Sequence, residues 1–123
     1  MIPPEVVLPL LCKILQGRKE ESFVVVILNV HAQVTAWCEI ARGSTKAVEV
    51  SVREFFRTAL MLDAAGVLIA HNHPSGDPTP SAEDVVLTAK LTKAGDLIGC
   101  PIVDHIIIGG GDRFYSFASK DSA

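Results

Sequence analysis

The sequence is poor in cysteine and lacks long hydrophobic runs. Its 123 residues contain three cysteines, Cys12, Cys38 and Cys100, at wide spacings and without a Cys-x-x-Cys pair. These spacings indicate neither a disulfide framework nor a thiolate zinc site, and they favour buried free thiols. The longest apolar run, residues 23–30, is interrupted by Asn29 and is far shorter than the roughly 18 to 20 residues that cross a bilayer. We therefore expect no transmembrane segment.

The chain also lacks an excess of basic residues. Eleven lysines and arginines stand against fourteen aspartates and glutamates, which gives a formal net charge of −3. A domain that binds nucleic acid usually carries a basic stripe, so this balance disfavours autonomous DNA binding. The N-terminus has neither the basic start nor the small-residue cleavage site of a secretory signal, and we therefore expect a cytoplasmic protein.

Hydrophobic residues, by contrast, are plentiful. Apolar residues make up 49% of the chain and charged residues only 20%. A chain of this length and composition can bury one independent core, and we found no internal repeat or interior linker. The sequence thus predicts a single domain over residues 1–123, with residues 118–123 as a frayed tail.

Hydrophobic periodicity predicts alternating helices and strands. The predicted helices cover residues 4–15, 51–65 and 81–98, and the predicted strands cover residues 23–28, 34–41, 67–70, 102–109 and 113–117. In the second helix, the residues expected to face inward are Val52, Phe55, Phe56, Ala59 and Leu60. This order predicts an α/β or α+β domain in which helices flank a mixed sheet.

The residues with metal-binding chemistry follow the strand at 67–70. Side chains two residues apart in a strand share a face, so His71 and His73 should project together while Asn72 points away. After a loop that its prolines keep non-helical, the next helix begins with Asp84 in its first turn, where the helix dipole keeps a carboxylate ionised. Two histidines and one carboxylate with a fourth position open are typical of a catalytic zinc site, where bound water becomes acidic. Taken alone, however, Asp84 is also what a helix-capping pattern places there.

The same stretch resembles a known family. The arrangement His71-x-His73, seven residues, Ser81, two residues, Asp84 matches the JAMM motif of the JAB/MPN metalloprotease superfamily. Within that superfamily, the segments 70–81 (AHNHPSGDPTPS) and 104–109 (DHIIIG) are similar to the bacterial RadC branch. The resemblance extends from about residue 20 to residue 117.

This resemblance implies a fold, a cofactor and an activity. The fold is that of cytidine deaminases, with one zinc ion per chain at the positions of His71, His73 and Asp84. The family uses a glutamate at the start of an early strand as general acid and base; Glu21 matches it, with the adjacent Glu20 as the alternative. Ser81 matches the serine that positions water or stabilises the oxyanion. The implied activity is that of a metallopeptidase or isopeptidase acting on a peptide or protein substrate.

Two alternatives to the hydrolase remain at this stage. The family name connects RadC with DNA repair, and zinc could instead serve a non-catalytic module by tying the loop at 74–80 to the sheet. His105 is read as a core histidine, with a supporting role behind the metal ligands as the alternative. The predicted strands at 34–41 and 113–117 are candidate edges, which could bind a peptide or a second copy of the chain.

Overall fold

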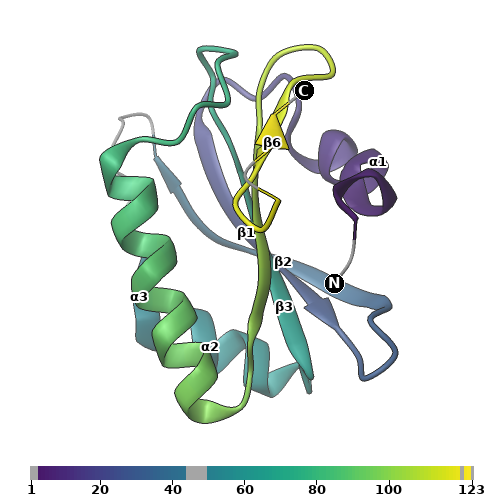
Figure 1. Cartoon of the computed structure of the whole chain (residues 1–123), viewed down its shortest axis with the longest axis vertical. Helices are drawn as coiled ribbons and strands as arrows, with labels where there is room; N and C mark the ends of the chain where they lie inside the picture. Colours follow the sequence, from purple (N-terminus) through teal and green to yellow (C-terminus); the bar gives the residue numbers. More distant parts are fainter. Residues whose placement is uncertain (1–2, 44–49, 120, 123) are drawn as a thin grey trace.

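The computed structural model describes residues 3–43, 50–119 and 121–122. Its strands form one six-stranded mixed sheet in the order β2-β1-β3-β4-β5-β6, with α1 on one face and α2 and α3 on the other (Figure 1). The elements are α1 (Pro4–Leu15), β1 (Glu21–Leu28), β2 (Val34–Gly43), α2 (Val52–Met61), β3 (Gly66–Asn72), α3 (Ala82–Ile98), β4 (Ile102–Ile108), β5 (Phe114–Ser116) and β6 (Asp121–Ser122). The predicted α+β class, a mixed sheet flanked by helices, is confirmed.

The two strands that carry the site lie in the middle of the sheet. β1 is antiparallel to both β2 and β3, and Phe23 pairs with His71. Every residue of β3 is buried, as is every residue of β1 after Glu21, because both faces are covered by helices. In antiparallel neighbours the start of one strand meets the end of the other, so Glu21 lies at the end of the sheet where β3 delivers His71.

Each face of the sheet has its own core. Under α1, Val7 and Leu11 pack against Val24 and Val26, while under α2 and α3 the centre is Phe23 with its apolar neighbours. α1 runs through Pro9 without ending. This two-layer burial fixes the register of the central strands, because a slip by one residue would exchange their two faces.

The second helix differs from its prediction in two respects. Ser51 caps it as expected, accepting a hydrogen bond from the Glu54 amide at 3.1 Å, but α2 ends at Met61 and not near residue 65. Leu60, expected to face inward, is 50% exposed. The buried stripe is formed by Phe55, Phe56 and Ala59, so Leu60 lies on the margin of a helix that ends one residue later.

The far edge of the sheet also differs. Of the predicted frayed tail at 118–123, residues 120 and 123 lie outside the described part of the chain, while Asp121 and Ser122 pair with Ser116 and Tyr115 as β6. A two-residue strand leaves no periodic pattern in the sequence, which is why composition suggested a tail. As a consequence β5 is not an edge strand, and of the two predicted edges only β2 is one. Within the described residues, no helix is both long and apolar enough to cross a membrane.

Candidate metal site and its supporting groups

The two predicted histidine ligands converge at the end of β3. His71 is fully buried, and its Nε2 lies 3.1 Å from Nε2 of His73, whose side chain is 14% exposed. The rings meet edge to face with centroids 5.0 Å apart. Because the His73 side chain is partly exposed and His71 is not, the site opens to solvent on the His73 side.

The third predicted ligand reaches the same point from α3. Asp84 places Oδ1 3.3 Å from Nε2 of His71 and Oδ2 3.1 Å from Nε2 of His73. The carboxylate also completes a capping box, in which Oδ2 accepts from the Ser81 amide at 2.8 Å. The two interpretations of Asp84, helix cap and ligand, are therefore geometrically compatible.

Electrostatics at the cluster favour an ionised Asp84. Burial opposes ionisation, but the two neighbouring histidines and the hydrogen bond from the Ser81 amide hold the pKa of the Asp84 carboxyl far below its ordinary range. Burial would lower the pKa of His73, yet the bonds to Asp84 and to the Asp77 carbonyl raise it overall. A negative oxygen group therefore lies beside two imidazoles that have been partly removed from water.

The donor set fits a zinc ion. Ligands 2.0 to 2.2 Å from zinc at tetrahedral angles lie about 3.3 to 3.5 Å from one another. The donor atoms observed here, Nε2 of each histidine and the two carboxylate oxygens of Asp84, make contacts of 3.1–3.3 Å, with a different Asp84 oxygen facing each histidine. The Nδ1 atom of His73 faces the Asp77 carbonyl at 2.9 Å, and since a carbonyl only accepts, Nδ1 carries the proton and the neutral ring keeps its Nε2 lone pair for a metal.

Glu21, and not Glu20, faces this cluster. A carboxylate oxygen of Glu21 and one nitrogen each of His71 and His73 all lie within 4.8 Å of one another. Glu20 instead approaches Arg42, with 4.0 Å between Nη1 and Oε1. Burial is the largest effect on Glu21 and raises its pKa, although the two histidines pull it down. The cluster thus contains a half-buried carboxyl whose pKa burial raises, and together with His71 and His73 it could also hold a metal ion.

Asn72 fixes the backbone on either side of Glu21. Its Oδ1 accepts from the Ser22 amide at 2.7 Å, and its Nδ2 donates to the Glu20 carbonyl at 3.0 Å. The sequence predicted that Asn72 points away from the histidines, but not what it binds. That partner depends on the pairing of β1 with β3, which is invisible in a local pattern.

Ser81 lies at the N-cap of α3. Its Oγ accepts from the Asp84 amide at 3.1 Å, so the hydroxyl is anchored next to a ligand. The predicted cap is present. The bond to Asp84 uses an acceptor lone pair, which leaves the hydroxyl proton for donation.

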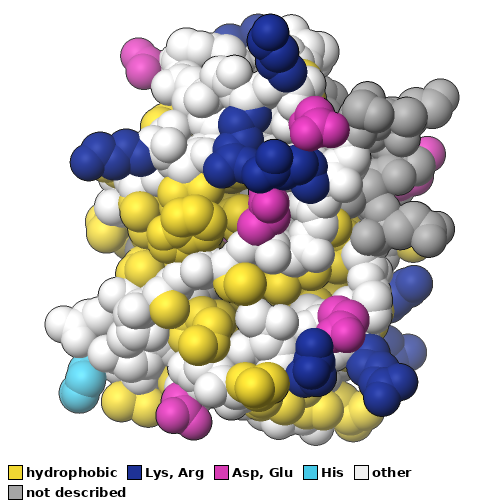
Figure 2. All heavy atoms as spheres, turned by 180° about the vertical axis from the view of Figure 1, so that it is seen from behind, with side chains coloured by type: hydrophobic (Ala, Val, Ile, Leu, Met, Phe, Trp, Pro, Cys, Tyr) yellow, Lys and Arg dark blue, Asp and Glu magenta, His cyan; other side chains and the backbone are white. Residues whose placement is uncertain are grey.

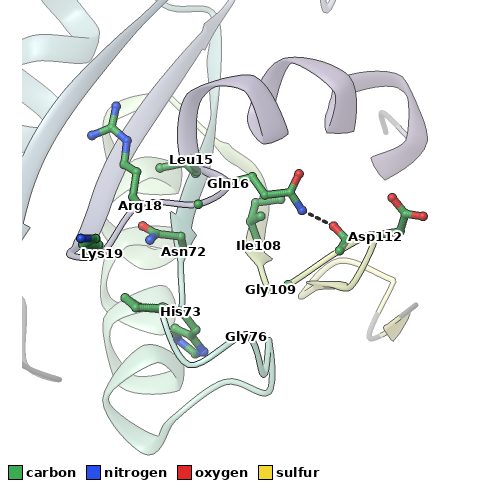
Figure 3. A pocket seen from close by; sticks show the side chains of 14 residues that line it. Leu15, Gln16, Arg18, Lys19, Asn72, His73, Gly76, Ile108, Gly109 and Asp112 are labelled. Atoms are coloured by element: carbon green, nitrogen blue, oxygen red, sulfur yellow. Dashed lines mark hydrogen bonds between the residues drawn. The ribbon is translucent and has the colours of Figure 1, made fainter.

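A groove of about 680 Å³ lies on the His73 side of the cluster (Figure 3). Its walls come from the turn after α1, the end of β3 and the turn between β4 and β5. Arg18 and Lys19 line it at one end, and the Gln16 side chain donates to the Gly111 carbonyl across it. Of the cluster, the lining includes His73, so the groove meets the cluster at its exposed edge.

Comparison with known proteins places this geometry in a family. The family model described as "RadC-like JAB domain" matches residues 2–122. The chain belongs to the RadC-like JAB domain family. This membership relates it to the JAMM superfamily and confirms the resemblance found in the sequence.

Relatives in the RadC-like family carry names that state no activity. A UPF0758 protein of Desulforamulus reducens is 44% identical over 117 residues, covering 95% of this chain and 51% of the relative. One of Methanosarcina mazei is 43% identical with the same two coverages, and one of Geobacter sulfurreducens is 41% identical over 85% of this chain and 45% of the relative. The chain thus spans about half the length of the relatives it matches.

Proposed function

We propose that this RadC-like domain is a zinc-dependent hydrolase that cleaves an amide bond in a peptide or protein. The observation that carries the proposal is the convergence of His71, His73 and Asp84, with donor atoms 3.1–3.3 Å apart beside the Glu21 carboxyl. Membership of the RadC-like JAB family supports it. Three ligands with a fourth position open are typical of catalytic zinc and not of structural zinc.

Each polar group then has a task. His71, His73 and Asp84 would hold the ion, which when bound supplies Lewis acidity that acidifies water and polarises a carbonyl. Glu21 accepts a proton from the attacking water and returns it to the leaving nitrogen, for which a raised pKa is suitable. Ser81 donates its hydroxyl proton to the oxygen that gains negative charge. The groove beside His73 receives the chain to be cleaved.

Metal content tests the ligand set. Protein purified without added metal should contain about one zinc per chain by elemental analysis, and His71→Ala and Asp84→Ala should both lose it. His31→Ala and Glu83→Gln are matched controls, because both side chains are exposed and neither belongs to the cluster. Full zinc occupancy in both ligand variants would refute the site.

Hydrolysis tests the role of Glu21. With a mixture of linear and isopeptide-linked peptides analysed by mass spectrometry, Glu21→Gln should lower cleavage by about 10²-fold or more while zinc content and fold persist. Glu20→Gln is the matched control, because this neighbour faces Arg42 and not the histidines. Equal cleavage by the two variants would leave no place for Glu21 as general base.

The non-catalytic zinc module is the main rival. The loop at 74–80 is already tied without metal, since the Gly76 amide donates to the His73 carbonyl and the Gly110 amide to the Gly76 carbonyl, both at 2.9 Å. A metal would therefore add little to the attachment of the loop. If zinc were only structural, Glu21→Gln would change no function of the protein.

Autonomous DNA binding receives less support. Among the described residues on the face seen in Figure 2, basic and acidic side chains are interspersed and form no continuous basic stripe. Arg18 and Arg42 are both engaged by Glu39. Retention of linear DNA by the isolated domain in a gel shift at physiological ionic strength would revive this alternative.

A further inference from the structure

Behind His71, a chain of hydrogen bonds runs away from the proposed metal position into the core. Nδ1 of His71 lies 2.8 Å from Nε2 of His105, and Nδ1 of His105 lies 2.5 Å from Oγ1 of Thr88. Thr88 in turn donates to the Asp84 carbonyl at 2.7 Å, one helical turn back along α3. The chain therefore begins and ends on two of the proposed zinc ligands.

Two directions of protonation are conceivable for such a chain of neutral groups. In one, Thr88 accepts from Nδ1–H of His105, whose Nε2 accepts from Nδ1–H of His71, and the Nε2 lone pair of His71 faces Nε2 of His73 and Oδ1 of Asp84, 3.1 and 3.3 Å away. In the other, every bond is reversed and His71 carries its proton on Nε2, where a metal would have to bind.

Thr88 decides between these directions. Its hydroxyl has a single proton, and the oxygen 2.7 Å away in the Asp84 backbone can only accept. The reversed chain would send that proton to His105 and leave two oxygen lone pairs facing each other. The proton on Thr88 is therefore committed to Asp84, and Nδ1 of His105 must be the donor to Thr88.

Burial and stacking hold the two rings in place. His71 and His105 are 0% and 1% exposed. Phe117 stacks on His105 with centroids 4.7 Å apart and planes at 12°, and Phe23 stacks on His71 at 5.4 Å and 19°. These contacts oppose a ring flip that would exchange the nitrogens, so only proton placement remains to be fixed.

We propose that Thr88 and His105 are positioning residues that hold His71 in its Nδ1–H tautomer and so present the Nε2 lone pair towards His73 and Asp84. The tautomer is a property of the metal-free protein. Its value for metal binding rests on the proposed function, because only a cation uses that lone pair. Outer-shell partners of this kind typically change metal affinity by about 10- to 100-fold.

Nitrogen NMR tests the tautomer directly. Long-range proton–nitrogen spectra of histidine-labelled, metal-free protein at mildly alkaline pH should show His71 and His105 both protonated on Nδ1. Thr88→Val removes the acceptor at nearly constant volume and should shift His71 towards the Nε2–H form. Thr88→Ser keeps the hydroxyl and should restore the original spectrum.

Chelator competition measures the consequence. With Zn²⁺ as the probe, Thr88→Val should bind about 10- to 100-fold more weakly than the wild type. Thr92→Val, a half-buried threonine one turn further along α3, should bind as the wild type does. His105→Gln, whose amide oxygen can accept from His71, should bind more tightly than His105→Leu; these replacements remain informative if Thr88→Val does not fold.

The outcomes separate this inference from the proposed function. An Nε2–H tautomer of His71 in the wild type, or equal zinc affinities for Thr88→Val and Thr92→Val, would overturn it. If instead the tautomers are as expected but neither the wild type nor the variants bind zinc, the inference about His71 stands and the proposed zinc hydrolase is refuted.

Discussion

Asn72 lies between two proposed ligands and holds the backbone around the proposed base. The strand alternation that sends His71 and His73 to one side sends Asn72 to the other, where its amide bridges the Glu20 carbonyl and the Ser22 amide. The tripeptide at 71–73 thus carries two proposed ligands, and its central Asn72 also holds the backbone on either side of the proposed base, Glu21.

Replacing Asn72 should separate catalysis from metal binding. Asn72→Ala leaves the Ser22 amide and the Glu20 carbonyl without their partner, which should cost about 1–3 kcal/mol in the free energy of unfolding. Because Glu21 then loses its anchor, kcat should fall while zinc content stays near one per chain. Denaturant melts, elemental analysis and peptide cleavage measure the three quantities, with Asn29→Ala in the β1–β2 turn as control. Loss of zinc together with activity would show that Asn72 supports the ligands instead.

At the scale of elements, two helices begin with the same serine cap. Ser51 and Ser81 each accept from the amide three residues on, both at 3.1 Å, but only Ser81 is next to the candidate site. Ser51→Ala and Ser81→Ala should therefore each cost about 1 kcal/mol in the free energy of unfolding. Only Ser81→Ala should also slow peptide cleavage, since its hydroxyl is the proposed oxyanion donor.

Denaturant melts and cleavage rates decide between cap and catalyst. Equal activity in the two serine variants would reduce Ser81 to its structural role. If both serine variants lost cleavage activity in proportion to their loss of folded protein, Ser81 would likewise have only a structural role.

Substitutions at two glycines test whether close backbone packing holds the loop at 74–80 in place. A Cβ on Gly109 would lie 2.6 Å from the Gly76 carbonyl oxygen, and one on Gly95 would lie 2.5 Å from the Cys100 carbonyl oxygen. Both Gly109→Ala and Gly95→Ala should destabilise the protein by about 1–3 kcal/mol. Only the first should weaken zinc binding, because it displaces the loop whose Asp77 carbonyl orients His73.

Zinc competition with a chelator and thermal melts measure these effects. If Gly95→Ala weakened zinc binding as much as Gly109→Ala, the effect would reflect general loss of stability and not the seating of the loop.

The elements that bear the site were largely predictable from the sequence. A period of two at His71-Asn72-His73 and a Ser-x-x-Asp helix start are local signals, and both led to side chains that converge. For His105 the sequence left a supporting role behind the ligands as an alternative, but its contact with Thr88 gave no local signal, because that contact depends on how α3 packs against β4. The end of α2 was also missed, because Asp63 adopts a φ of 56° and so leaves the helical conformation without a glycine or proline to mark the end.

At the scale of the whole molecule, one carboxylate joins three segments. Glu39 of β2 pairs with Arg18 after α1 and with Arg42, and it accepts from the Ser22 hydroxyl on β1. Burial would raise the pKa of Glu39, but these donors hold it below its ordinary value of 4.5. A carboxyl whose pKa is depressed on folding stabilises the protein above its unfolded pKa and loses that contribution as the pH falls through the folded value.

The pH dependence of unfolding in acid should therefore reveal the contribution of Glu39 to stability. Glu39→Gln should be less stable than the wild type near neutral pH, and the difference should shrink as the pH falls below about 4.5, measured as urea midpoints across the range. Glu54→Gln, which breaks an exposed pair with Arg57, should change stability little at any pH. A wild-type advantage over Glu39→Gln that stays constant down to the acid limb would contradict this linkage.

The proposed ligands and the proposed base come from separate parts of the chain. His71, His73 and Asp84 all lie within one continuous β3–loop–α3 segment, whereas Glu21 comes from β1. Under the proposed function, a single substitution at residue 21 would abolish turnover and leave the metal in place. A metal-loaded but inactive chain would then be one substitution away, and the identity of residue 21 would separate active relatives from inactive ones.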